Sequence, residues 1–293
     1  MNSENKEIGS GDFDELKALM EDYSPDFKVR LLKYIAQNNI GSCSTEIYSK
    51  IKPLFQNEFK SVRAEAFKTV GLIFFRSGEE EVLQELKKHL ESEKQGSVII
   101  SLIEGFGKIL EGTKNEKYYD FLKKFLFHDN EKVRRTTANV IASIFIGANK
   151  QEIITDLLKA LSLSKAGDQE YIDAIEKVIG GKVTEKNLIC FLRDCLDDKD
   201  YQIAIGATRI LAIIFKSKTF IDEKIVSKLM NLAETKPQTR PTIASAFGQI
   251  YAQSKNMRII SFLKTLLKSE KNKDARKIIF SAIREIIKDN DIE

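Results

Sequence analysis

A motif that returns about every 35 residues constrains this 293-residue chain more than any other feature. Each copy has an acidic or polar turn, a Val-Arg-like pair, several small residues and an apolar stripe, as in residues 58–71 and 129–142. The position of Val62 recurs at intervals of 33 to 37 residues, at Val29, Val98, Val133, Glu170, Ile203, Thr239 and Ala275. A fixed internal period of this length predicts similar structural units stacked on their neighbours.

The segments between these positions have a helical pattern of their own. Their apolar residues stand at i, i+3, i+4 and i+7, the pattern of one face of an α-helix, and strand-like alternation is absent. The segments cover residues 13–19, 47–55, 82–86, 118–125, 153–158, 188–192, 225–229 and 259–263. Each period therefore holds a first helix, followed by a second helix that carries the recurring motif. The chain is expected to be all-α.

Capping residues and prolines mark where these helices are expected to begin. Four pairs have capping-box spacing before a first helix: Asp12 with Glu15, Ser77 with Glu80, Thr113 with Glu116, and Asn149 with Glu152. Pro25 and Pro237 fall where second helices start, and a first helical turn tolerates proline because its missing N–H would be unpaired there. Pro53 falls inside a first helix and is expected to kink it.

The repeated pattern resembles HEAT repeats: an acidic turn, Val-Arg, small residues and a late Gly or Ala. The resemblance implies a right-handed α-solenoid of about eight short helical hairpins over residues 12–289, with tails at 1–11 and 290–293. Its spacing is shorter than the ~40–47 residues of HEAT and armadillo units and close to that of tetratricopeptides. The chain has no Trp, however, and lacks the other tetratricopeptide markers. The fifth copy departs from the motif, because it has Glu170-Tyr171 in place of Val-Arg and a Gly180-Gly181 pair after it. This departure predicts a bend of the solenoid near 163–182. The alternative is ordinary sequence variation between repeats.

Cysteine content and hydropathy bear on the compartment. The chain holds Cys43, Cys190 and Cys195, an odd and sparse set that gives no disulfide framework and favours reduced, buried thiols. The longest apolar stretch, residues 140–148, is far too short to span a bilayer. We expect a cytoplasmic protein without membrane insertion, with the nucleus as the alternative compartment.

The residue types that commonly serve in catalytic and metal sites are sparse in this chain. The histidines, His89 and His128, fall near the ends of first helices, where interaction with the helix dipole is the simpler role. Two histidines and three scattered cysteines do not form a zinc site, and no phosphate-binding loop is present. HEAT-like DNA glycosylases use aromatic pockets that include Trp, which this chain lacks. We therefore expect no enzyme activity, no metal and no cofactor.

Arginine recurs directly after the position held by Val62 and its counterparts in the other repeats, which is called the motif position below. These residues are Arg30, Arg63, Arg134, Arg240 and Arg276. In HEAT-like repeats such an arginine bonds to an adjacent turn, so the resemblance implies a structural ladder; the alternative is a basic stripe for phosphate or acidic peptide. Basic residues outside this position are better candidates for binding a partner, namely Arg135, Arg209, Lys277 and Arg284.

The function expected from these features is a non-catalytic scaffold or adaptor. HEAT-like solenoids usually line their concave side with the second helices, so the resemblance implies a protein partner held there. The alternative is a nucleic-acid-binding protein, in DNA repair or chromatin, that uses its basic C-terminal end. Residues 216–293 hold 16 basic and nine acidic residues, whereas the rest of the chain is nearly neutral.

Overall fold

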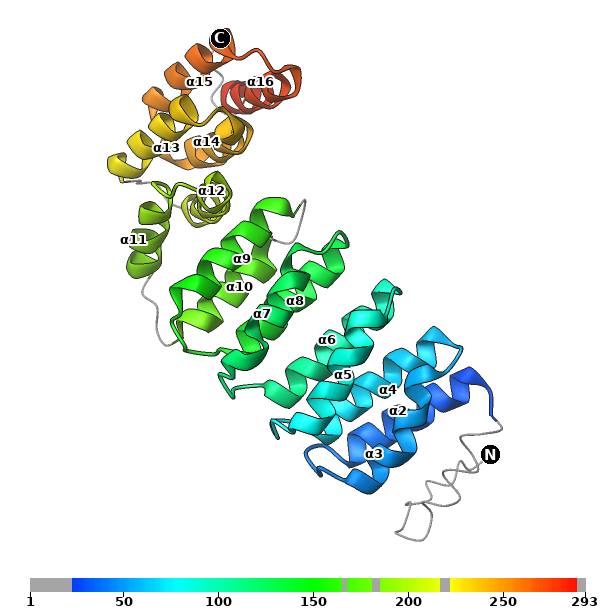
Figure 1. Ribbon diagram of the computed structural model, residues 1–293. Helices are drawn as coiled ribbons and strands as arrows, with labels where there is room; N and C mark the ends of the chain where they lie inside the picture. The colour runs from blue at the N-terminus through cyan, green and yellow to red at the C-terminus, as the bar shows by residue number, and fades with distance from the viewer. Residues whose placement is uncertain (1–22, 165–167, 181–184, 217–221, 289–293) are drawn as a thin grey trace, which may run out of the picture. The chain divides into compact units, whose positions relative to one another are not determined.

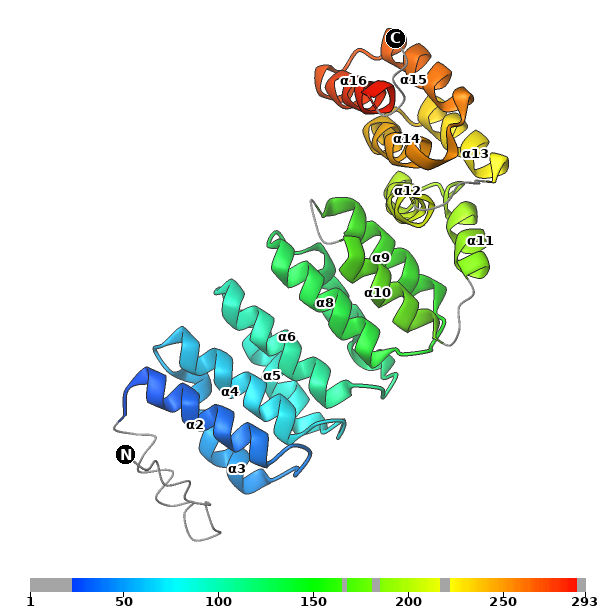
Figure 2. The same ribbon diagram turned by 180° about the vertical axis from the view of Figure 1, so that it is seen from behind.

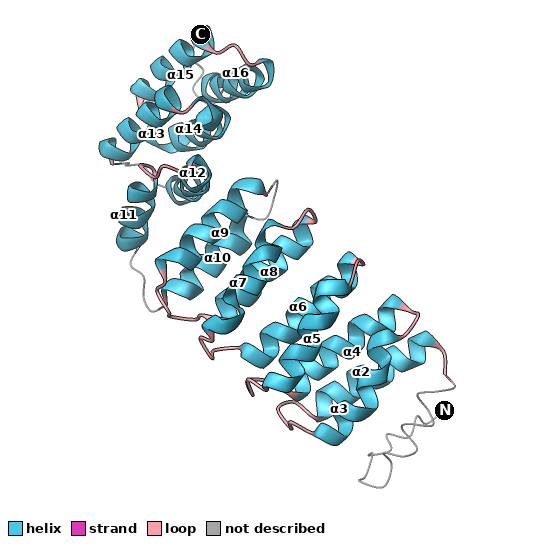
Figure 3. Cartoon of the chain, in the orientation of Figure 1, coloured by secondary structure: helices cyan, strands magenta, loops and turns pink. Residues whose placement is uncertain are grey.

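A computed structural model describes residues 23–164, 168–180, 185–216 and 222–288 of the chain. Within these ranges the regular structure is entirely helical, as the cartoon in Figure 3 shows, which confirms the all-α prediction. The tails expected at 1–11 and 290–293 lie outside the described residues, as do the first predicted helix and the Asp12–Glu15 pair.

The chain divides into two compact units, Met1–Phe145 and Ile146–Glu293. Each unit has its own buried core of aliphatic and aromatic side chains. One continuous solenoid over residues 12–289 stays a prediction, and the units are described separately below.

The first unit consists of two rows of helices (Figures 1 and 2). The second helices α2 (Pro25–Asn38), α4 (Lys60–Ile73), α6 (Gly96–Leu110) and α8 (Glu131–Ile144) form one row, in which each packs on the next. The other row holds the first helices α3 (Thr45–Ile51), α5 (Glu80–Ser92) and α7 (Tyr119–Lys123). Short 3₁₀ segments extend two of them, η1 (Lys52–Gln56) after α3, and η2 (Glu116–Tyr118) and η3 (Lys124–Phe127) around α7.

Small residues allow the second helices to approach each other closely. A Cβ atom placed on Gly71 would lie 2.4 Å from the Cα atom of Gly105, and one on Gly107 would lie 2.6 Å from Cγ1 of Val140. Carbon atoms in ordinary contact are ~3.5–4.0 Å apart. The small residue at this point of the repeat therefore permits close packing at Gly71 and Gly107.

The helix boundaries confirm the proline predictions and correct the capping ones. Pro25 opens α2 behind the N-cap Ser24, and α3 gives way to a 3₁₀ segment that has Pro53 in its first turn. Ser77, however, accepts a hydrogen bond from the N–H of Glu79, and Glu79 is the N-cap of α5, so Ser77 is not. Thr113 makes the same short turn, and the N-cap is Asn115. The N-cap of α9 is Lys150, so the predicted cap Asn149 was also wrong by one residue.

The second unit begins with a hairpin of α9 (Gln151–Leu163) and α10 (Asp168–Ile179). Its other first helices are α11 (Glu185–Cys195), α13 (Glu223–Thr235) and α15 (Met257–Ser269). The second helices α12 (Tyr201–Phe215), α14 (Arg240–Ser254) and α16 (Lys273–Lys288) pack in sequence, and the 3₁₀ turn η4 (Pro237–Thr239) leads into α14.

The fifth copy is where regular packing changes. Helix α12 packs mainly on α9, a first helix, rather than on the second helix α10. Gly206 of α12 permits this contact, since a Cβ atom there would lie 2.3 Å from the carbonyl oxygen of Leu158 in α9. Within this unit α9 thus occupies the place beside α12 that a second helix occupies in the regular pattern.

Backbone hydrogen bonds between successive hairpins fix the register of the repeats and correct two sequence assignments. Equivalent bonds join Gly41 N–H to Leu72 O, Arg76 N–H to Lys108 O, Gly112 N–H to Ser143 O, and Gly147 N–H to Lys177 O. By this register the counterpart of Val62 in α2 is Phe27, so the assignment to Val29 was wrong by two residues. In the fifth copy the counterpart is residue 167, outside the described ranges, so the assignment to Glu170 was wrong as well.

Candidate partner-binding surface

Two of the recurring arginines join consecutive repeats. Arg63 donates from Nε to Oε2 of Glu93 at 3.2 Å, and from Nη1 to the carbonyl oxygens of Asn57 and Glu58. Arg240 donates from Nη1 to Oε2 of Glu270 at 3.0 Å, and from Nε to a carbonyl oxygen of its own hairpin. In both cases the carboxylate lies 30 residues further along the chain, in the turn of the next hairpin. Charge-assisted bonds of this kind fix the spacing between repeats.

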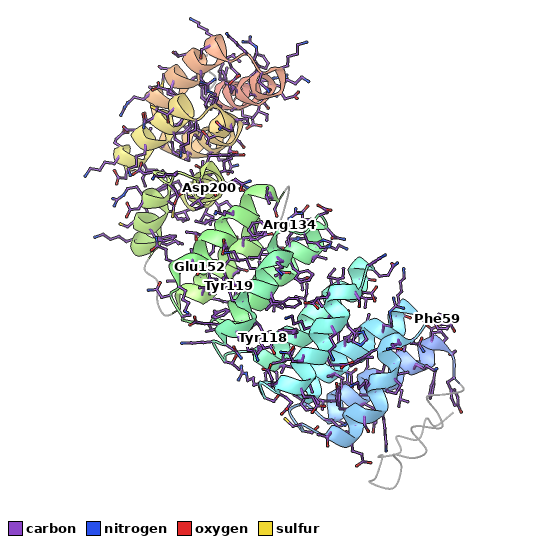
Figure 4. All side chains as sticks on the ribbon, viewed as in Figure 1. Phe59, Tyr118, Tyr119, Arg134, Glu152 and Asp200 are labelled. Atoms are coloured by element: carbon purple, nitrogen blue, oxygen red, sulfur yellow. The ribbon has the colours of Figure 1, made fainter. Side chains whose placement is uncertain are left out.

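Arg134 and Arg276 cap the first helix of their own hairpin. Arg134, labelled on α8 in Figure 4, donates from Nη1 to the carbonyl oxygens of His128 at 2.8 Å and Asp129 at 3.0 Å. Arg276 donates from Nη1 to Leu267 O at 2.8 Å and Glu270 O at 3.0 Å. A guanidinium group at this end satisfies carbonyls that have no intrahelical partner and complements the helix dipole. Arg30 is exposed on α2, and the corrected register places it outside this set.

The carboxylates that meet Arg63 and Arg240 titrate at low pH. The backbone N–H of Asn272, together with Arg240, holds the pKa of Glu270 below its ordinary value. Burial raises the pKa of Glu93, but the N–H of Gln95 and the guanidinium of Arg63 outweigh it, so its pKa is also lowered. Both carboxylates are therefore charged at neutral pH, as the ion pairs require.

Replacing Arg134 with alanine is expected to lower the free energy of unfolding by about 1–2 kcal/mol, because a buried side chain loses its packing and two carbonyls lose their donor. The far-UV circular dichroism of the native protein should not change, since the bonds lie between elements. Urea denaturation followed by circular dichroism measures both. An unchanged denaturation midpoint would show that water replaces the guanidinium at no cost.

A separate feature, the groove of the second unit, lies across the row of second helices. It encloses about 560 Å³, and its lining comes from the end of α9 and from α12, α14 and α16. Its apolar side chains include Ile205, Ile213 and Ile278, and the last of these is exposed. Its polar side chains are hydroxyls and one amide, from Ser162, Ser164, Thr242, Ser245 and Gln249.

Arg209 is the charged residue of this groove. Its Nη1 donates to the carbonyl oxygens of Leu161 at 2.5 Å and Ser164 at 2.7 Å, so it caps the C-terminal end of α9. The structure does not bring the other three candidates to the groove lining: Arg135 is half-buried on α8 of the first unit, and Lys277 and Arg284 are exposed on α16. Within the second unit, Lys277 and Arg284 thus do not join Arg209 in the groove lining.

Three of the basic residues in 216–293 make contacts between repeats. Lys228 of α13 pairs with Asp197, and Lys236 donates to the carbonyl oxygen of Asp198. Arg258 of α15 pairs with Glu223 of α13 at 2.5 Å. These contacts join hairpins along the chain.

Polar links between consecutive first helices were missed by sequence reasoning. Glu80 at the start of α5 accepts bonds from Lys117 and from the hydroxyl of Tyr118, which lie one repeat further on; Figure 4 labels Tyr118. These bonds and one from Gln84 lower the pKa of Glu80 to about 2. In the second unit Glu223 accepts from Asn256 and Arg258 in the same manner. An acidic residue in one first turn, followed one repeat later by a donor, is the signal that could have found them.

The histidines and cysteines occupy structural surroundings. His89 lies against the rings of Phe55 and Phe67 and near Glu85, and Nδ1 of His128 accepts the N–H of Asn130. Burial, together with Asp198 and Asp194, raises the pKa of the Cys195 thiol to about 12. Cys43 is exposed, which corrects the expectation that the cysteines are buried. Over the described ranges, no cluster of His, Cys, Asp and Glu suits a metal ion.

Comparison with known proteins identifies the fold. No family model matches the sequence, and no curated protein matches it. Among solved structures, Kap121p matches over 97% of this chain and 34% of its own, with a TM-score of 0.55 and 13% identity. Two multiply substituted mutants of Kap121p match with TM-scores of 0.55 and 0.56 and identities of 13% and 12%.

The match is limited in extent and in sequence. The chain spans about a third of the length of Kap121p, 34%.

None of the helices in the described part of the chain combines the length and apolar character that crossing a membrane requires. At this level of identity the likeness shows the fold alone, which agrees with the repeated motif and the two helical rows: the chain has the HEAT-like α-solenoid fold of Kap121p.

Proposed function

We propose that this protein is a non-catalytic scaffold that holds an extended segment of a partner protein in the groove over α12, α14 and α16. The observation that carries the proposal is the lining of that groove. Three isoleucines offer apolar contact, and hydroxyl and amide groups are spaced among them. A bound peptide requires both apolar and hydrogen-bonding contacts, because its side chains bury apolar area while its backbone N–H and C=O groups require hydrogen-bond partners.

The charge of the groove favours a protein over a nucleic acid. Binding to a phosphate backbone is dominated by lysine and arginine that neutralise phosphates. Arg209 alone supplies positive charge among the lining residues, and its guanidinium is engaged with two carbonyls of α9. The basic residues 228, 236 and 258 are engaged as well. The charge of the groove lining therefore supports a peptide rather than a nucleic acid as its occupant.

Replacing Ser245 with arginine tests the groove, because Ser245 is exposed in its lining and a long charged side chain would fill it. We expect a partner captured by the wild-type protein from native lysate to be depleted at least about tenfold with Ser245→Arg, as for truncation of a binding hot spot. Quantitative mass spectrometry of the captured material, with and without nuclease, measures this. Cross-linking from position 249 should then map the bound segment of the partner.

The matched control is Ser261→Arg, the same substitution at an exposed serine on the first helix α15 of the same unit. It should retain the partner. Loss of the partner on nuclease treatment would favour nucleic acid instead. Equal retention by both variants would show that the groove is not the binding surface.

A further inference from the structure

A stripe on several second helices is covered by the next repeat. It consists of the residues 5, 9 and 12 positions after the motif position, which have the i, i+4, i+7 spacing of one helix face. Four helices show it within their units: Phe67, Gly71 and Phe74 of α4; Ile103, Gly107 and Leu110 of α6; Thr208, Ala212 and Phe215 of α12; Ala244, Gly248 and Tyr251 of α14. All twelve residues are buried. The large members of the stripe thus contribute to the core between repeats.

Helix α16 carries the same stripe, which no other part of the described chain covers. Its members are Phe280, Arg284 and Ile287, and Phe280 and Ile287 are 57% and 36% exposed. Fully buried counterparts such as Phe67 and Ile103 are at most 1% exposed. An aromatic and a β-branched side chain are therefore held in water at the register where four other helices bury theirs. Transfer of such area out of water is favourable by ~25 cal/mol per Å².

Arg284 limits what can cover this face. It occupies the position of Gly71, Gly107, Ala212 and Gly248, where small residues permit close helix contact. A further second helix could not approach α16 as closely as α6 approaches α4. A second copy docked about a twofold axis with the two α16 helices parallel would place Arg284 and Lys277 of one helix beside the same residues of the other, and like charges repel.

The charges on the face indicate the chemistry of its occupant. Lys277 lies one turn before Phe280 on the same side, and its side chain is 80% exposed. Its contact with Asp274 is a 3.5 Å pair between residues of one helix, both open to solvent, which contributes little. Lys277 and Arg284 therefore flank Phe280 with positive charge.

We propose that the outer face of α16, formed by Lys277, Phe280, Arg284 and Ile287, binds an amphipathic helix of a partner protein. Apolar residues of that helix cover Phe280 and Ile287, and its carboxylates meet Lys277 and Arg284. An amphipathic helix suits a face with anchors at i and i+7, because its own apolar residues recur at i, i+3, i+4 and i+7. This surface is distinct from the groove, whose α16 residue is Ile278.

The test uses two helical peptides of about five turns. Both have leucines along one face; one carries glutamates beside them, and the other carries lysines at the same places. Fluorescence anisotropy with the full-length protein should show that the glutamate peptide binds at least about tenfold more tightly than the lysine peptide. Phe280→Ser should weaken the glutamate peptide at least about tenfold, and the double variant Lys277→Glu with Arg284→Glu should reverse the preference between the peptides.

Two matched controls keep the result specific. Phe59→Ser removes an aromatic residue of similar exposure, 45%, from the first unit (Figure 4), and Ser245→Arg alters the groove. Neither should change peptide binding. The proposal is overturned if neither peptide binds, if Phe280→Ser binds the glutamate peptide as the wild type does, or if sedimentation shows a dimer that Phe280→Ser abolishes. If Ser245→Arg loses the partner of the groove but still binds the glutamate peptide, that result bears on the proposed function and not on the outer face of α16.

Discussion

Gly71→Ala is expected to lower the free energy of unfolding of the first unit by about 3 kcal/mol, the upper range for overpacking a well-packed core. The new methyl group would lie 2.4 Å from Cα, 2.7 Å from the carbonyl oxygen and 2.9 Å from the carbonyl carbon of Gly105. All three neighbours are backbone atoms, so no side-chain rotation can relieve the clash. Helices α4 and α6 must separate, and the buried side chains between them then lose contacts.

Gly248→Ala is the matched control, because Gly248 holds the same register position on α14. Its new Cβ atom would lie 3.5 Å from Cβ of Ala282 and 3.6 Å from Oε2 of Glu285, which are ordinary contact distances. Alanine is favoured over glycine within a helix by ~1 kcal/mol, so this variant should be as stable as the wild type or more stable. Urea denaturation, with hydrogen exchange to assign each unit, compares the two. Equal effects would show that helix separation at this register does not depend on the small residue.

These glycines also show how far the sequence could predict the fold. The repeat period, the two helices of each hairpin and the small residues at the close contact follow from local spacing, and the structure confirms them. The positions of Val29 and Glu170 were misjudged because two neighbouring register choices both place apolar residues inward. Hydrogen bonds between hairpins such as Gly41 N–H to Leu72 O decide between the choices, and those pairs are distant in sequence.

The fifth copy and the candidate sites depended on tertiary contacts that a period cannot reveal. Glu170-Tyr171 and the paired glycines marked an irregular copy, but the packing of α12 on α9 arises from Gly206 and Leu158, one residue on each helix. Arg209 was selected as a surface cation, whereas the structure places its guanidinium on the carbonyls that end α9. The groove combines residues from four helices, and no short motif encodes such a set.

Arg240→Met is expected to lower the free energy of unfolding of the second unit by about 2 kcal/mol. Removing one partner of a buried ion pair typically costs ~3–5 kcal/mol. The smaller value follows because Glu270, 7% exposed, keeps the N–H of Asn272 as a donor, and because the methionine retains apolar packing. Arg258→Met is the control: its pair with Glu223 also joins two repeats, but the side chains are 57% and 53% exposed, so the loss should stay below about 1 kcal/mol.

The pH dependence of the Arg240→Met effect separates the ion pair from the other bond of the guanidinium. The pKa of Glu270 is lowered in the folded protein, so its stabilising contribution is present at neutral pH and is lost as the pH falls through the folded pKa, below the ordinary value of 4.5. In Arg240→Met the buried carboxylate loses its cation and is protonated more readily. The stability difference between wild type and variant should therefore shrink from pH 7 to acid pH, measured by urea denaturation at each pH. A difference that stays constant would assign the stabilisation to the bond from Nε to the carbonyl oxygen of Ala233, which does not titrate.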